Sequence, residues 1–190
     1  MKVFSLSFLL IFFFIPIFAE TNNVSKLGNF SIGTRFNLNF SQAPKDLAFG
    51  IEINSPLLFN RIGLNGEVDY AFLRGVRDTA VIKDEEVFNY LVYKIGILIS
   101  PGEKNEFVRP YAKIGWIILD TKDEIFSQSQ YNGIYGSFGM NISLEKINFL
   151  GLFLEVSSYG FFDRVIVEKL LKDPTFGEGI IFSIGLKAFI

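Results

Sequence analysis

The chain has 190 residues, with 18 basic and 20 acidic side chains, 23 Phe, and neither His nor Cys. This near-balance of charge excludes a strongly basic nucleic-acid binder, and the lack of Cys excludes a disulfide framework or a thiolate metal site. The length suits one domain, for which we expect no cofactor and no nucleic-acid partner.

The first 19 residues have the pattern of an export signal. Lys2 supplies a positive charge, residues 3–15 are almost entirely apolar, and Ala19 ends the segment on a small residue. The apolar run is shorter than the roughly 20 residues that a helix needs to cross a bilayer. We therefore predict that residues 1–19 are a cleaved signal peptide and that residues 20–190 form one exported domain.

From Phe30 onward, apolar residues alternate with glycine, small polar residues and charged residues. Successive side chains of a β-strand point to opposite faces, so each such run has one apolar and one polar face. The alternation predicts eight strands, at residues 30–40, 47–54, 62–72, 90–99, 108–118, 133–144, 150–157 and 180–190.

The connections between these strands alternate in length. The first connection, residues 41–46, is short. Of the others, the short ones are residues 55–60, 100–106 and 145–148, and the longer, polar ones are residues 73–86, 119–130 and 160–175. Outer-membrane barrels combine short periplasmic turns with long outer loops, and a narrow eight-stranded barrel suits an interior of small and polar side chains. The sequence therefore predicts an all-β fold, an eight-stranded antiparallel transmembrane β-barrel with an up-and-down meander. The alternative is a secreted, soluble lipocalin-like barrel whose apolar face turns inward.

Two segments resemble the small eight-stranded outer-membrane barrels of the OmpA and OmpX type. Arg109-Pro110-Tyr111, followed by Gly115 and Trp116, resembles a strand common in that family. Residues 185–190 resemble the terminal strand that the barrel-assembly machinery reads, although here an Ile follows the last aromatic residue. The resemblance implies an outer-membrane location, contact with outer-membrane lipid, and the assembly machinery as a partner during biogenesis.

Nine charged residues fall on the polar faces and are expected to point into the lumen as one network. They are Arg35, Glu52, Glu67, Asp69, Lys94, Arg109, Lys113, Glu155 and Lys187. Buried charges must be paired, because an unpaired one costs several kcal/mol. The network is either a plug that fills the lumen or a gate whose alternative pairing opens a narrow water path.

Hairpin geometry makes two of these pairs specific. A turn centred between Ala43 and Pro44 would pair Phe40 with Leu47 and would place Arg35 opposite Glu52. A similar centre for the connection between the third and fourth strands puts Glu67 near Lys94.

Enzymes among the outer-membrane barrels resemble one another in relying on a His, which this chain lacks, so a Ser or water has no usual base. Glu67 and Asp69 are the one close pair of carboxylates on a shared face, and a structural role fits them. We expect no enzyme and no catalytic, cofactor-binding or metal-binding residues. The predicted function is a structural or surface-interaction role through the outer loops, the alternative is a small gated pore, and an outer-membrane enzyme is the remote third.

The longest loop contains a short apolar pattern after Asp163. Val165, Ile166, Leu170 and Leu171 would share one face of a short amphipathic helix. This patch either packs on the barrel rim or binds an extracellular or host protein, since exposed apolar clusters often mark interaction sites.

Overall fold

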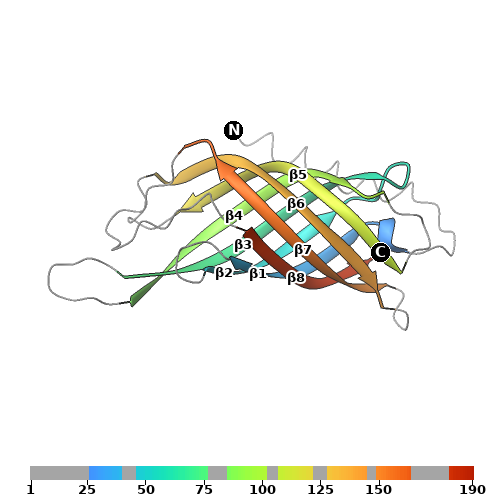
Figure 1. Ribbon diagram of the computed structural model, residues 1–190, viewed down its shortest axis with the longest axis horizontal. Coiled ribbons are helices and arrows are strands. Elements are labelled where there is room, and N and C mark those ends of the chain that lie inside the picture. Colours follow the sequence, from blue (N-terminus) through green and yellow to red (C-terminus); the bar gives the residue numbers. More distant parts are fainter. Residues whose placement is uncertain are drawn as a thin grey trace.

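The computed structural model describes residues 26–39, 46–76, 85–101, 107–121, 128–144, 149–163 and 180–190. These segments form one short 3-10 helix and eight strands (Figure 1). Their bounds are η2 Lys26–Gly28, β1 Ser31–Asn39, β2 Asp46–Asn54, β3 Ile62–Val76, β4 Glu85–Ile99, β5 Val108–Thr121, β6 Gln130–Ser143, β7 Leu150–Phe161 and β8 Ile180–Phe189. Within the described segments, no helix has the length and hydropathy needed to cross a membrane.

The strands close into a single antiparallel barrel in meander order. Each strand pairs with the next one along the chain, and β8 pairs with β1 from Ser31–Phe189 to Asn39–Ile181. Closure leaves no strand edge with unpaired backbone groups, which a lipid environment requires. The structure confirms the predicted eight-stranded barrel, whose strands run obliquely to its long axis (Figure 1).

The apolar face of every strand lies on the outside of the barrel. Along β2, Ile51 is 54% exposed whereas its neighbour Glu52 is fully buried, and along β5 Ile114 is 61% exposed whereas Lys113 is 3% exposed. A soluble barrel would bury its apolar face, so the lipocalin-like alternative is wrong. An apolar exterior around a charged interior is the arrangement of a membrane-spanning barrel.

One end of the barrel holds η2, the turn between β2 and β3, and the C-terminus (Figure 1). The backbone N–H of Leu57 donates to the carbonyl of Gly28 at 2.8 Å, and that of Ile190 donates to Phe30 at 2.8 Å. Leu27 is buried at the same end. By the usual asymmetry of such barrels, this is the periplasmic end.

The register between β1 and β2 differs from the predicted one by two residues. Arg35 pairs with Gly50 and Glu52 pairs with Gly33, so Arg35 is not directly opposite Glu52. The assumed turn position was wrong, because the observed pairs are symmetric about a point one residue earlier. A shift of two residues keeps every side chain on its face, so the predicted faces remain correct.

Two hairpins are longer than predicted. Pairing between β3 and β4 continues to Val76 and Glu85, and pairing between β5 and β6 continues to Asp120 and Gln130. These residues were expected to lie in loops because their hydropathy no longer alternates. The antiparallel ladder nevertheless satisfies their backbone N–H and C=O groups, which is independent of side-chain pattern.

Candidate functional site

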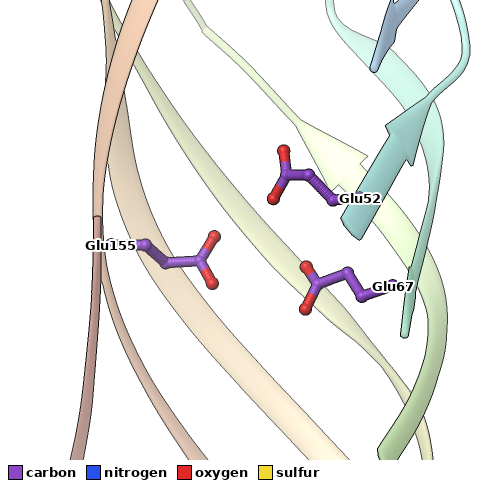
Figure 2. Close-up of side chains that lie close together, drawn as sticks. All are labelled: Glu52, Glu67 and Glu155. Atoms are coloured by element: carbon purple, nitrogen blue, oxygen red, sulfur yellow. The ribbon is translucent and has the colours of Figure 1, made fainter. Parts of the chain in front are cut away.

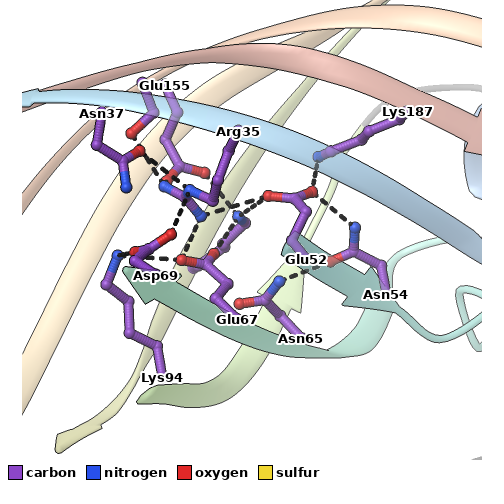
Figure 3. A network of polar contacts seen from close by, with 12 residues as sticks. Arg35, Asn37, Glu52, Asn54, Asn65, Glu67, Asp69, Lys94, Glu155 and Lys187 are labelled. Atoms are coloured by element: carbon purple, nitrogen blue, oxygen red, sulfur yellow. Dashed lines mark hydrogen bonds and ion pairs between the residues drawn. The ribbon is translucent and has the colours of Figure 1, made fainter. Parts of the chain in front are cut away.

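The middle of the lumen holds the guanidinium group of Arg35, which β1 directs inward (Figure 3). Its Nη1 atom lies 3.4 Å from Glu52 Oε2 and also contacts Glu67. Its Nη2 atom donates to Glu155 Oε1 at 2.9 Å, and its Nε atom lies 3.5 Å from Asp69 Oδ1. One cation therefore joins four strands, β1, β2, β3 and β7, across the lumen.

Three of these carboxylates converge on a second cation. The carboxylate oxygens of Glu52, Glu67 and Glu155 lie within 4.8 Å of one another, and the three side chains point toward a common centre (Figure 2). The ammonium group of Lys113 lies 3.2 Å from Glu52, 2.6 Å from Glu67 and 2.7 Å from Glu155. Lys113 thus supplies the positive charge that a metal ion would bring, and we assign no metal to this group of acids.

Two further lysines complete the arrangement. Lys94 Nζ lies 3.1 Å from Glu67 and 3.0 Å from Asp69, and Lys187 contacts Glu52 and donates to Asn141 at 3.1 Å. We call the following eight residues the charge cluster: Arg35, Lys94, Lys113, Lys187, Glu52, Glu67, Asp69 and Glu155.

Positive and negative groups are equal in number within the charge cluster, and all of them are buried. Isolated charges at such positions would carry a desolvation penalty of several kcal/mol each, which mutual pairing offsets. Because every carboxylate of the cluster is held by at least one cation, none is available as a general base. The arrangement is therefore suited to filling and ordering the lumen.

Aromatic residues surround the cluster, and the sequence analysis assigned them no role. Tyr111 donates to Glu155 at 3.0 Å, Tyr135 donates to Asn65 at 3.0 Å, and the ammonium group of Lys187 lies 4.3 Å from the ring centroid of Phe153. The sequence does contain a signal for these inward-facing rings. Each is an aromatic residue on a strand face, with glycine, polar or charged residues as its neighbours on that face. Rings that lie close to a buried cation stabilise it by cation–π attraction.

Arg109 lies apart from the charge cluster, near the periplasmic end. Its Nε atom donates a hydrogen bond to Ser100 Oγ at 2.8 Å, and its Nη2 atom donates one to the carbonyl oxygen of Asn60 at 2.5 Å. It also packs against the backbone of Gly28. Arg109 therefore ties two turns and the N-terminal segment together, whereas the prediction grouped it with the central charges.

The outer part of the lumen is mostly apolar, which the sequence analysis did not anticipate. Its buried apolar residues are Ala48, Ala71, Tyr90, Ile117, Leu119, Tyr131 and Ile181, and its buried polar residues include Asn37 and Thr121. A cavity of about 30 Å³ is lined by most of the apolar residues and also by Asn37, Asp69 and Lys94. The lumen is thus divided into an apolar outer zone and a charged middle zone.

No protein-family model matches the sequence, and no curated protein sequence matches it. Two solved barrels from Pseudomonas aeruginosa are similar in structure. The outer membrane protein OprG aligns with a TM-score of 0.60 and 13% identity, covering 85% of this chain and 95% of that one. The N-terminal β-barrel domain of OprF aligns with a TM-score of 0.52 and 12% identity, covering 85% and 98% respectively. The fold is that of a small outer-membrane β-barrel.

Together with the apolar exterior, this likeness places the chain among transmembrane barrels of the outer-membrane type. The apolar patch of Val165, Ile166, Leu170 and Leu171 lies outside the described residues, as does the predicted signal peptide. The interaction role of that patch therefore stays a prediction.

Proposed function

We propose that the protein is a closed outer-membrane barrel whose outer loops contact molecules outside the cell. The main support is the filled lumen, in which the four cations and four carboxylates of the charge cluster form a buried, neutral group centred on Arg35 and Lys113. An eight-stranded barrel has an interior just wide enough for side chains, so a filled lumen suits a scaffold.

Because the lumen is filled, the outer loops are the part of the barrel that is available to bind other molecules. The strand ends Val76, Thr121 and Phe161 lie opposite the periplasmic end and lead into the connections at residues 77–84, 122–129 and 162–179. Loops on a rigid frame carry binding function in many folds. We propose that the patch of residues 165–171 binds an extracellular or host protein.

Conductance of the mature chain tests the closed lumen. Residues 20–190, refolded and shown to be inserted in a planar bilayer, should give no discrete current steps, because each charge of the cluster is buried and paired. Reproducible single-channel steps would contradict the closed barrel and would favour the second candidate function.

That second candidate, a small gated pore, is favoured by one observation. Arg35 lies within ion-pair distance of Glu52, Glu67, Asp69 and Glu155, which together offer more acceptors than one guanidinium group can fully satisfy. Alternative pairings of Arg35 would move charge across the lumen and open a water path. A pore of this kind should conduct more when Glu52 is replaced by Ala, whereas a simple plug should only lose stability.

The loop proposal has its own test. Bacteria that display the full chain should adhere to a host-cell or matrix surface, and replacement of residues 164–177 by a short Gly-Ser turn should abolish adherence. The matched control is the same replacement at residues 122–127. Equal adherence of the unaltered strain and both loop-replaced strains would contradict binding through the patch of residues 165–171.

We further propose that biogenesis uses the barrel-assembly machinery, for which β8 supplies the terminal strand, and that the outward residues contact outer-membrane lipid. A β8 variant with Phe189→Ala should then reach the outer membrane in reduced amount. Unchanged levels in a membrane fraction would count against recognition through this residue.

A further inference from the structure

The apolar zone of the lumen lies just outside the charge cluster and draws its side chains from β2, β3, β5, β6 and β8, whereas β1 contributes the buried Asn37 beside Ala48. We call it the apolar collar and define it by six buried residues: Ala48, Ala71, Ile117, Leu119, Tyr131 and Ile181. Strand pairing places Ala48 beside Ala71 and Leu119 beside Tyr131, so the collar spans neighbouring strands on both sides of the lumen.

The collar lies outward of the charges, one inward-facing position beyond Asp69 on β3 and two such positions beyond Glu52 on β2 and Lys113 on β5. Ala71 follows Asp69 on the inner face of β3, and Ile117 pairs with Lys94 between β5 and β4. On β8, Ile181 stands outward of Ser183, which accepts a hydrogen bond from Arg35 at 2.9 Å. Anything that enters from outside must therefore pass the collar before it reaches the charges.

Water can form hydrogen bonds with side chains on the inner side of the collar but finds few such partners among the collar residues. The cavity of about 30 Å³ has room for a water molecule or two. Five of the six collar residues form its apolar wall, and its polar wall consists of Asn37, Asp69 and Lys94. Asp69 Oδ1 is buried and accepts no hydrogen bond among the described residues, so a water there would have a partner. The collar side chains offer one hydroxyl, that of Tyr131, which accepts from the backbone N–H of Gln128 at 3.1 Å.

We propose that the apolar collar is a dewetted seal in series with the charge cluster, so that the outer entrance stays shut even when the ion pairs rearrange. Narrow apolar constrictions exclude ions because water does not fill them and an ion cannot shed its hydration shell. The inference rests on the closed lumen proposed above, and it assigns the outer barrier to Ile117, Leu119 and their neighbours rather than to Arg35 and Glu52.

Thiol labelling from outside the cell tests this seal, since the natural chain contains no Cys. The reporter is Ser183→Cys, a near-isosteric change just inside the collar, and the control reporter is Ser129→Cys, which is exposed at the outer end of β6. Both full-length variants are displayed on intact cells and treated with a positively charged methanethiosulfonate. Ser183→Cys should react at least about tenfold more slowly than Ser129→Cys.

Polar substitution of the collar should remove the protection. Ile117→Ser combined with Leu119→Ser should raise the labelling rate of the Ser183→Cys reporter by at least about tenfold, because the ring becomes wider and wettable. Ile117→Val combined with Leu119→Ile keeps the ring apolar and should leave labelling slow. Should the serine pair fail to yield a folded barrel, Ala48→Ser with Ala71→Ser makes the same test with smaller changes.

The contrary outcomes separate the two proposals. Fast labelling of Ser183→Cys behind the natural collar would overturn the seal and the closed-lumen function together. Slow labelling behind both the natural and the serine-substituted collars would overturn the seal alone and leave the closed barrel standing.

Discussion

At the scale of single residues, close packing inside the lumen depends on glycines that face aromatic rings across the strands. Tyr111 pairs with Gly139 and Phe153 pairs with Gly185 in neighbouring strands. A Cβ atom on Gly139 would stand 2.6 Å from the backbone carbonyl oxygen of Leu154 and 2.6 Å from the Tyr111 side chain, closer than real Cβ contacts allow. Small residues at these positions let a narrow barrel hold large inward side chains.

This packing predicts that Gly139→Ala destabilises the barrel by about 1–3 kcal/mol through overpacking against Tyr111. The matched control is Gly160→Ala, because a Cβ there meets nothing within 4 Å. Unfolding by urea in lipid vesicles gives both free energies. A Gly139→Ala barrel as stable as the control would show that the Tyr111 ring and the Leu154 backbone both move aside at little cost.

The central guanidinium group is the residue on which most charges depend. Arg35→Met leaves the four carboxylates of its ion pairs facing only Lys94, Lys113 and Lys187, and removal of one partner from a buried group costs about 3–5 kcal/mol. Arg35→Lys should lose less, since the charge is kept. Urea midpoints of the two variants compare them, and equal midpoints would mean that charge balance does not matter here.

At the scale of strands, the lipid-facing residues differ in depth. Ile51 lies opposite Thr34 and Val68, beside the charge cluster, whereas Leu38 is next to the outer end of β1. A polar substitution on the outer face is penalised most at the middle of the bilayer. The position of a residue along its strand therefore decides how much its hydropathy matters.

Ile51→Arg should lower the free energy of unfolding by about 2–4 kcal/mol, and Leu38→Arg by about 0–1 kcal/mol near the interface. Measurement of both variants in bilayers of one thickness makes the comparison direct. The reverse order would mean that the membrane boundary crosses the barrel at a different height.

At the scale of the whole molecule, the barrel is inside-out relative to a soluble protein, with a charged interior and an apolar exterior. The single tryptophan reports on that exterior. Trp116 is 44% exposed, its ring centroid lies 5.0 Å from that of Phe162, and its indole N–H donates to Asn132 at 3.3 Å. An indole with a polar contact at one end is typical of a lipid-facing aromatic near an interface.

Fluorescence of the refolded chain should therefore be quenched strongly by brominated lipid and weakly by aqueous iodide. The reason is that Trp116 projects toward acyl chains rather than into the lumen. Strong iodide quenching with no effect of brominated lipid would contradict the assigned exterior.

Alternation of hydropathy, with a period of two, determined the number of strands, their faces and hence the barrel. An error of two residues in the first hairpin did not alter any face, because two is the period of the strand. The same parity identified every member of the charge cluster as inward-facing. The sequence also predicted that Arg109 points inward, but it did not predict that Arg109 lies apart from the cluster at the periplasmic end.

Only the tertiary structure decided which side chains meet. Arg35 and Glu155 are 120 residues apart along the chain, and closure of the barrel brings β1 and β7 to the same level of the lumen. Residues 116–119 are all apolar, so alternation alone did not separate the lipid-facing members from Ile117 and Leu119 of the collar. Tilt and closure set these relations because they depend on the geometry of all eight strands at once.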